Sequence, residues 1–289
     1  MKEPLFTGVC TALVTPFLNG QINYPMLDML ISRQIEANIP AIVLAGTTGE
    51  APTLSDNEKI ELFHRGKLTA GNRCKIIAGT GSNNTAHAIA LSIDAEKAGA
   101  DALLVVSPYY NKSTPDGLFA HYIAIAHAVT IPLIIYNVPS RTGMDIPVSV
   151  YQRLSRVPNI IGVKEASTDI TKFMRIRTAC GPEFTIWTGN DDLTVGACAL
   201  GAAGVISVTS NLLPNEVSDM TIAALNGDFD TAADLQCKLQ ALNDLLFCQV
   251  NPIPIKAAMK IIGYDCGSCR LPLSGLALEY QQQIEALLK

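Results

Sequence analysis

A lysine inside an apolar run has the most distinctive chemistry in this sequence. Lys164 ends the run 159–164, which has the composition of a buried β-strand, and a period of two places Ile160, Gly162 and Lys164 on one face. Gly162 leaves space on that face, and burial of an ammonium is costly, so the neutral amine is favoured. A neutral amine inside a protein can form a Schiff base with a ketone. The alternative is a lysine that extends to solvent or pairs with Glu165.

Two threonines and an arginine could bind carboxylates. The segment Gly46-Thr47-Thr48-Gly49 offers two hydroxyls and several free N–H groups in a glycine-flanked turn, which suits a small carboxylate. The alternative is an ordinary β/α turn. Arg141 follows Pro139 in a stiff loop, and its guanidinium could bind a second carboxylate through paired hydrogen bonds. The alternative is a surface arginine.

Two tyrosines are candidates for proton transfer. A phenol both donates and accepts hydrogen bonds, so Tyr110 and Tyr136 could relay protons at a site formed by the groups above. The alternative for each is a packing role with a satisfied hydroxyl.

The candidate residues lie at or near the ends of short apolar runs. These runs alternate with longer helical stretches, and the spacing leaves room for one helix and two loops each time. They are almost continuously apolar, as parallel strands buried on both faces should be. The eight runs cover 8–14, 41–45, 75–79, 102–107, 133–137, 160–165, 184–189 and 204–208.

Eight β/α units in series predict an α/β fold of the (β/α)₈ TIM-barrel type. In that fold the active site lies at the C-terminal mouth of the strands. From about residue 228 onwards no strand pattern continues, and helices are expected over 230–248, 254–262 and 276–288. We therefore expect a barrel over 1–227 and a C-terminal helical region over 228–289.

Composition excludes several classes of protein. Of 289 residues, 48% are hydrophobic and 16% charged, which supports a large core and argues against disorder. The net charge of -5 and the lack of a basic stripe argue against a nucleic-acid partner. No uninterrupted apolar run reaches about 18 residues, which argues against a membrane span. The eight scattered cysteines suggest reduced thiols, so a cytoplasmic protein is expected.

Potential metal ligands are discounted. Cys266 and Cys269 have the spacing of a zinc or redox pair, but no second pair accompanies them, so a loop with two thiols is favoured. Asp191 and Asp192 should point apart and suit the start of a helix. The histidines fall in predicted helices and are assigned to packing or to the surface. They are His64, His87, His121 and His127.

Lysines other than Lys164 are expected to be solvated, because they fall on predicted helices or loops. They include Lys59, Lys112, Lys172 and Lys256.

Taken together, four segments resemble the pyruvate-dependent class I aldolase family that includes dihydrodipicolinate synthase and N-acetylneuraminate lyase. The resemblance runs from Gly8 to about Leu273, and each segment ends a predicted strand. The segments are Gly46-Thr47-Thr48-Gly49-Glu50, Ser107-Pro108-Tyr109-Tyr110-Asn111-Lys112, Tyr136-Asn137-Val138-Pro139-Ser140-Arg141-Thr142 and Gly162-Val163-Lys164-Glu165-Ala166.

The resemblance implies a role for each candidate residue. Lys164 forms an imine with pyruvate, and Thr47 and Thr48 hold the pyruvate carboxylate. Tyr136 moves protons, and Thr48 and Tyr110 complete a relay in which Tyr110 comes from a neighbouring subunit. Arg141 receives the carboxylate of L-aspartate 4-semialdehyde. The site is also lined by Gly189 and Ile206.

The resemblance also implies that no metal or organic cofactor is needed and that the chain forms a homo-oligomer, expected to be a tetramer. Relatives inhibited by lysine carry histidines and a glutamate where this sequence has Asp56, Lys59 and His87, although Asn83 and Tyr109 fit the pattern. Lys59 would place a cation where the ammonium of lysine should bind. Weak or absent lysine inhibition is therefore expected.

Two other functions stay open at this point. One is a sister pyruvate aldolase that acts on sialic acid or a 2-keto-3-deoxy sugar acid. The other is a barrel that binds a metabolite without catalysis. Arg141 and the paired threonines favour a small aldehyde that carries a carboxylate, and the complete set of reactive groups favours an enzyme.

Overall fold

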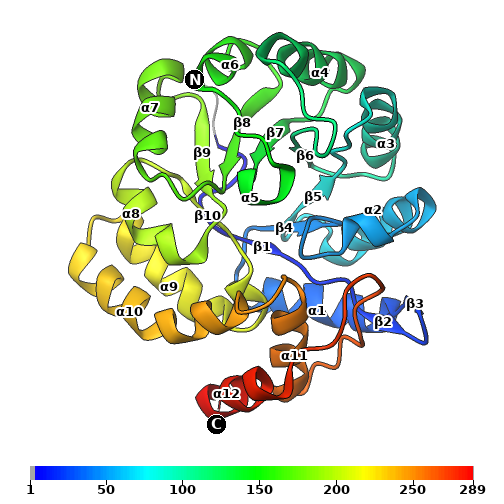
Figure 1. The fold of residues 1–289 in the computed structure, drawn as a ribbon, viewed down its shortest axis with the longest axis vertical. Helices are drawn as coiled ribbons and strands as arrows, with labels where there is room; N and C mark the ends of the chain where they lie inside the picture. Colours follow the sequence, from blue (N-terminus) through cyan, green and yellow to red (C-terminus); the bar gives the residue numbers. More distant parts are fainter. Residues whose placement is uncertain (1–3, 289) are drawn as a thin grey trace.

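The structure, a computed structural model, describes residues 4–288, and in these residues the chain closes a barrel of eight parallel strands (Figure 1). This confirms the predicted TIM barrel, and strand ends differ from the predicted ones by at most two residues. The barrel strands, in chain order, are β1 Gly8–Ala12, β4 Ala41–Leu44, β5 Lys75–Gly79, β6 Ala102–Val106, β7 Leu133–Asn137, β8 Ile160–Glu165, β9 Thr185–Thr188 and β10 Gly204–Ser207. A small antiparallel hairpin that the pattern analysis did not predict follows β1, and it consists of β2 Phe17–Leu18 and β3 Gln21–Ile22.

Helices surround the barrel, and their starts follow local capping signals. Ser55 and Glu58 form the predicted capping box at the start of α2, and the Thr114 side chain caps α4, with Pro115 in its first turn. The helices around the barrel are α1 Tyr24–Glu36, α2 Asp56–Ala70, α3 Thr85–Lys97, α4 Pro115–Ala128, α6 Val148–Leu154, α7 Thr171–Cys180, α8 Thr194–Ala199 and α9 Pro214–Leu225. Shorter helical segments lie in the loops, namely η1 Ala51–Thr53, α5 Pro139–Thr142, η2 Asp191–Leu193 and η3 Thr209–Asn211.

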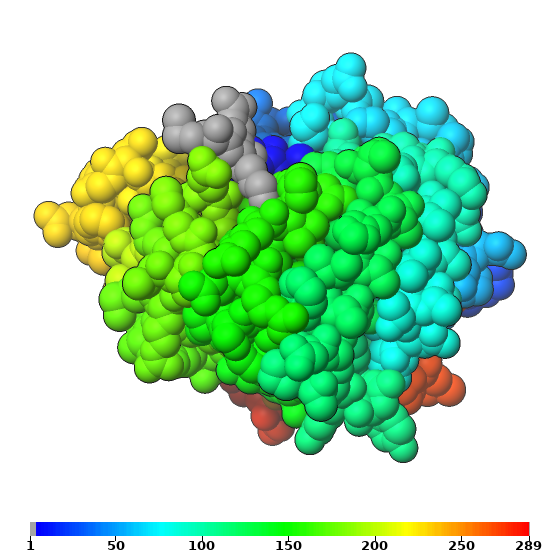
Figure 2. All heavy atoms as spheres, turned by 90° about the horizontal axis from the view of Figure 1, so that it is seen from above, coloured from blue at the N-terminus to red at the C-terminus, as the bar shows by residue number. Residues whose placement is uncertain are grey.

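The C-terminal region is helical, within two residues of the expected bounds. It contains α10 Phe229–Leu246, α11 Ile253–Ile261 and α12 Leu278–Leu288. Helix α10 packs against α8 and α9, while α11 contacts α10, α12 and η3. In Figure 2 the α10 segment projects at one side and part of the C-terminal segment shows at the lower edge, so both lie outside the ring of barrel helices.

The apolar core has two layers, which are separated by the strands. The inner layer fills the barrel with side chains such as Ile77, Leu104 and Trp187, and the outer layer packs strand residues such as Leu103 and Ile135 against the helices. This alternation explains why both faces of each strand are apolar.

Strand β8 departs from strict alternation. Its register with β7 shifts, because Leu133 pairs with Ile160 and Ile134 pairs with Gly162. The expectation that Ile160 shares a face with Lys164 was therefore wrong: at this bulge Ile160 packs in the outer layer and Ile161 in the inner layer. The space at Gly162 is also occupied, since a Cβ there would lie 2.9 Å from the Trp187 ring.

Two lysines expected to be solvated are buried. Lys172 and Lys256 are each 4% exposed. Lys172 lies 3.5 Å from Glu165, and Lys256 lies 2.7 Å from Glu50. The expectation failed because a buried carboxylate far away in the sequence compensates each ammonium.

Among residues 4–288, no helix is long and apolar enough to cross a membrane, and no cluster of three or more histidine, cysteine or acidic side chains could hold a metal ion. Cys266 is buried in the core, and burial raises the pKa of its thiol to about 12 and that of Cys269 to about 11.

Candidate active site

Lys164 and Tyr136 lie side by side inside the barrel. The register of β7 and β8 pairs the two residues, and the Lys164 Nζ atom lies 4.4 Å from the centre of the Tyr136 ring. Both side chains are buried, and no carboxylate of the described chain lies within ion-pair distance of Lys164. The alternative that Lys164 pairs with Glu165 is wrong, because Glu165 interacts with Lys172 outside the barrel. An amine without an ionic partner, next to a phenol, suits a nucleophile.

Gly189 and Ile206 take part in the same interior. A Cβ at Gly189 would lie 2.7 Å from the Ala166 Cβ and 2.8 Å from the Cε atom of Lys164, so the glycine leaves room for the lysine in its observed position. Ile206 is fully buried in the inner layer with Tyr136. Gly189 directly follows β9 beside Lys164, and Ile206 lies within β10 in the inner layer.

The turn that carries the two threonines follows β4. Thr48 is buried, while Thr47 is half-buried. The turn is closed by a hydrogen bond from the Glu50 N–H to the Thr47 carbonyl oxygen, and Glu50 has a φ of 56°. The Glu50 carboxylate accepts hydrogen bonds from the Lys256 ammonium (2.7 Å) and from the backbone N–H of Arg270 (2.9 Å). The C-terminal region thus fixes the threonine turn in place.

Asn251 is a site residue that the sequence analysis missed. Its side-chain amide donates to the Thr48 hydroxyl oxygen at 3.0 Å, and its backbone carbonyl oxygen accepts from the Arg141 guanidinium at 3.3 Å. It therefore bridges the residues proposed for the two carboxylates. Asn251 lies some two hundred residues from Thr48, outside every recognised motif, and no local signal in the sequence marks it.

A cavity of about 570 Å³ opens at the C-terminal mouth of the barrel. Its walls include Thr47, Tyr110, Tyr136 and Arg141. The other predicted residues are absent from these walls, namely Thr48, Lys164, Gly189 and Ile206. Tyr136 connects the two groups, because it lines the cavity and contacts the Lys164 amine.

Tyr110 and Arg141 are the exposed members of the site. The side chain of Tyr110 is 93% exposed, and its φ of 67° is a strained backbone conformation for an aromatic residue. The hydroxyl of Thr48 contacts Asn251 rather than Tyr110, so the expected relay is not formed within the described chain. Arg141 has no carboxylate partner among residues 4–288, which leaves its guanidinium available to an anion.

Two titratable groups interact electrostatically with Lys164, namely Cys10 in the inner layer and Asp191, which is hydrogen-bonded to Ser207. Burial raises the pKa of the Cys10 thiol, and burial also raises the pKa of the Asp191 carboxyl, which accepts hydrogen bonds from Ser207 and from the Val208 N–H. Asp191 is buried and Asp192 is exposed, so the two carboxyls point apart as predicted.

Comparisons with known proteins agree with this geometry. A family model described as the dihydrodipicolinate synthetase family matches residues 5–289. A 4-hydroxy-tetrahydrodipicolinate synthase of Thermoanaerobacter sp. (strain X514) is 46% identical, over 97% of this chain and 96% of that protein. The one from Acetivibrio thermocellus is 41% identical, over 100% of this chain and 98% of that protein.

The solved structures give the same result. A chloride-inhibited dihydrodipicolinate synthase from Acinetobacter baumannii, complexed with pyruvate, superposes with a TM-score of 0.96 at 41% identity and covers 98% of both chains. With the family model spanning the barrel and the C-terminal helices alike, the chain belongs to the dihydrodipicolinate synthetase family.

Proposed function

We propose that this chain condenses pyruvate with L-aspartate 4-semialdehyde to give 4-hydroxy-tetrahydrodipicolinate, a step of lysine and diaminopimelate biosynthesis. The observation that carries the proposal is the buried Lys164 amine, which has no carboxylate partner in the described chain and lies 4.4 Å from the Tyr136 ring. The names of the relatives support the same reaction, and one solved relative is described as a complex with pyruvate.

The chemistry begins at the Lys164 amine. It adds to the ketone carbon of pyruvate, and loss of water gives an imine. The protonated imine withdraws electrons, so a proton leaves the adjacent methyl carbon and an enamine forms. The enamine carbon then bonds to the aldehyde carbon. Attack of the semialdehyde's amino group on the imine carbon closes the ring and frees Lys164, and the net reaction releases one water.

The surrounding residues bind the substrates and move protons. Thr47 and Thr48 hold the pyruvate carboxylate, with the Thr48 oxygen oriented by Asn251. Tyr136 transfers protons, because its ring lies against the amine and its side chain lines the cavity. Arg141 binds the carboxylate of the semialdehyde at the exposed end of the cavity. Gly189 and Ile206 shape the interior around the imine.

The cycle needs neither a metal nor an organic cofactor, because the protonated imine is itself the electron sink. The substrates are small molecules, and we propose a cytoplasmic enzyme with no nucleic-acid or membrane partner. The proposed role of Tyr110 in the Thr48 relay of a neighbouring subunit requires at least a homodimer, and we propose that such dimers assemble into a tetramer, as the family resemblance implies. The exposure and strained backbone of Tyr110 support this arrangement.

Lysine should inhibit this enzyme weakly or not at all. The Asp56 carboxylate accepts from His87 at 2.8 Å and lies 3.6 Å from the Lys59 ammonium, and Lys59 and His87 both line the cavity. A cationic ligand would meet the Lys59 ammonium there. Assays with increasing lysine should show little change below millimolar concentrations, and strong inhibition at lower concentrations would contradict this expectation.

Substrate comparison tests the proposed reaction. Purified protein is assayed with pyruvate and either L-aspartate 4-semialdehyde or N-acetylmannosamine, and products are followed by mass spectrometry. The proposal predicts turnover of the semialdehyde alone. Preferential turnover of N-acetylmannosamine would favour a sister aldolase, which no observation in this structure supports.

A further inference from the structure

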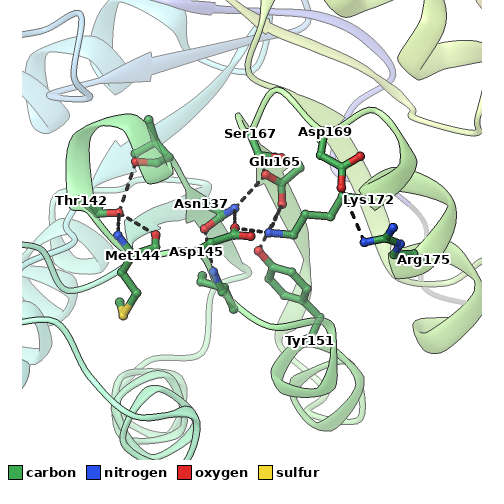
Figure 3. Close-up of polar contacts among 12 residues, drawn as sticks. Asn137, Thr142, Met144, Asp145, Tyr151, Glu165, Ser167, Asp169, Lys172 and Arg175 are labelled. Carbon is green, nitrogen blue, oxygen red and sulfur yellow. Dashed lines mark hydrogen bonds and ion pairs between the residues drawn. The ribbon is translucent and has the colours of Figure 1, made fainter.

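A polar network centred on the buried residues Asn137 and Glu165 lies at the ends of β7 and β8 (Figure 3). Asn137 follows Tyr136 and Glu165 follows Lys164 in the chain, and the two residues also pair in register. Consecutive strand residues point to opposite faces. Tyr136 and Lys164 therefore face the barrel interior, while Asn137 and Glu165 face the helices, where both are fully buried.

Three donors hold the Glu165 carboxylate. It accepts hydrogen bonds from the Asn137 amide (2.8 Å), the Ser167 N–H (2.9 Å) and the Tyr151 hydroxyl (3.3 Å). Burial and the nearby Glu165 raise the pKa of Tyr151, so its phenol remains a donor. These donors fix the carboxylate in place, one residue along the chain from the Lys164 amine.

Lys172 supplies the compensating positive charge from α7. Its ammonium lies 3.5 Å from Glu165 and also contacts Asp145, whose side chain is 55% exposed and accepts from Asn137. On the far side of this group, Asp169 is paired with Arg175 (Figure 3).

On its other sides, Lys164 faces the Tyr136 ring and interacts electrostatically with the Cys10 thiol and with the buried Asp191 carboxyl, which is hydrogen-bonded to Ser207. On the outer side of β8, Lys172 is the cation within ion-pair distance of Glu165, and it is shared with the more exposed Asp145.

We propose that Lys172 is a positioning residue for imine formation. Lys172 neutralises Glu165, so the charge of Glu165 does not stabilise the ammonium form of Lys164. This rests on the proposed function of Lys164. Without Lys172, the carboxylate behind β8 would hold a proton on the attacking amine, and the amine would become reactive only at higher pH. The network also ties β7 to β8 through Asn137, which keeps Tyr136 beside Lys164.

The test measures imine formation as a function of pH. Protein is incubated with pyruvate and cyanoborohydride between about pH 6 and about pH 10, and the rate of Lys164 labelling is followed by mass spectrometry. In Lys172→Met, the uncompensated charge of Glu165 should move the midpoint upward by about one pH unit and slow labelling near neutral pH about tenfold. Lys172→Arg should keep the wild-type midpoint, as should Lys260→Met at an exposed ion pair.

The double variant Glu165→Gln/Lys172→Met removes both charges and should return the midpoint to the wild-type value. Glu165→Gln alone should move it to lower pH, which keeps the proposal testable if Lys172→Met does not fold. An unchanged midpoint in either single variant, even with lower thermal stability, would show that Lys172 has a purely structural role. That result would overturn the inference about Lys172 and leave the proposed function standing. Absence of labelling in the wild-type protein would instead overturn the proposed function.

Discussion

Lys256 of α11 and Glu50 of the threonine turn form an ion pair of 2.7 Å in which both side chains are almost completely buried. The ammonium also lies 4.4 Å from the centre of the Phe17 ring, and the Arg270 guanidinium lies at the same distance from that ring. The C-terminal region therefore contributes directly to the site, since it anchors the turn that carries Thr47 and Thr48.

Lys256→Met should destabilise the protein by about 3–5 kcal/mol, because it leaves the Glu50 carboxylate buried without a counter-ion. The double variant Glu50→Gln/Lys256→Met should recover part of this loss. Free energies of unfolding from urea titrations at fixed protein concentration measure the effect. Lys97→Met, at an exposed pair with Asp94, is the matched control and should cost less than about 1 kcal/mol. Equal losses of unfolding free energy in Lys256→Met and Lys97→Met would contradict the importance given to the buried ion pair.

Gly189→Ala should slow imine formation by about tenfold to a hundredfold, because the new Cβ would displace the Lys164 side chain from its position. Crowding should also cost about 1–3 kcal/mol of stability. Gly275→Ala, where a Cβ meets nothing within 4 Å, should leave labelling rate and stability unchanged. Wild-type labelling in Gly189→Ala would show that Lys164 does not react from its observed position.

His121 should make stability depend on pH between about 4 and 6.5. Burial lowers its pKa from the ordinary 6.5 to about 4. In that window the unfolded chain binds more protons than the folded one, so the free energy of unfolding falls with falling pH, by up to about 1.4 kcal/mol per pH unit.

His121→Gln should flatten this dependence, as urea titrations at pH 5 and pH 6.5 would show. The pKa of Glu58, which Arg270 lowers to about 2, affects stability mainly below this range. The attribution of this pH dependence to His121 fails if the wild type and His121→Gln lose the same free energy of unfolding between pH 6.5 and pH 5.

Tyr110 and Lys164 should complement each other between subunits. Tyr110→Phe and Lys164→Ala are each expected to have little activity. If Tyr110 acts in the neighbouring site, each mixed dimer regains one of its two sites. Equal amounts of the two variants make about half of the dimers mixed, so about a quarter of wild-type activity should return. Activity of co-expressed variants measures this recovery. Recovery no greater than the mean of the two separate variants would show that Tyr110 acts within its own chain.

Much of the fold could be predicted, because each barrel strand is a short apolar run and helices such as α2 and α4 begin at side-chain caps. Residues at strand ends were placed at the mouth of the barrel on the same grounds. The bulge at Ile161 could not be predicted, because it depends on the register between β7 and β8. The alternation of residues along one strand does not indicate the register in which that strand pairs with its neighbour.

The contacts that support the site could also not be predicted from local sequence patterns. Lys172 and Lys256 have the local surroundings of solvated helix residues, and only tertiary structure brings each one to a buried carboxylate. Asn251 reaches Thr48 from the segment between α10 and α11. Such long-range polar contacts leave no period and no motif.

Reductive trapping of the pyruvate imine tests the central claim most directly. Wild-type protein treated with pyruvate and borohydride should gain about 72 Da per chain, the mass of pyruvate after loss of water and addition of two hydrogens. Peptide mapping should place this mass on Lys164, and Lys164→Arg should remain unlabelled. Labelling of a different lysine, or the absence of pyruvate-dependent labelling in folded protein, would contradict the account.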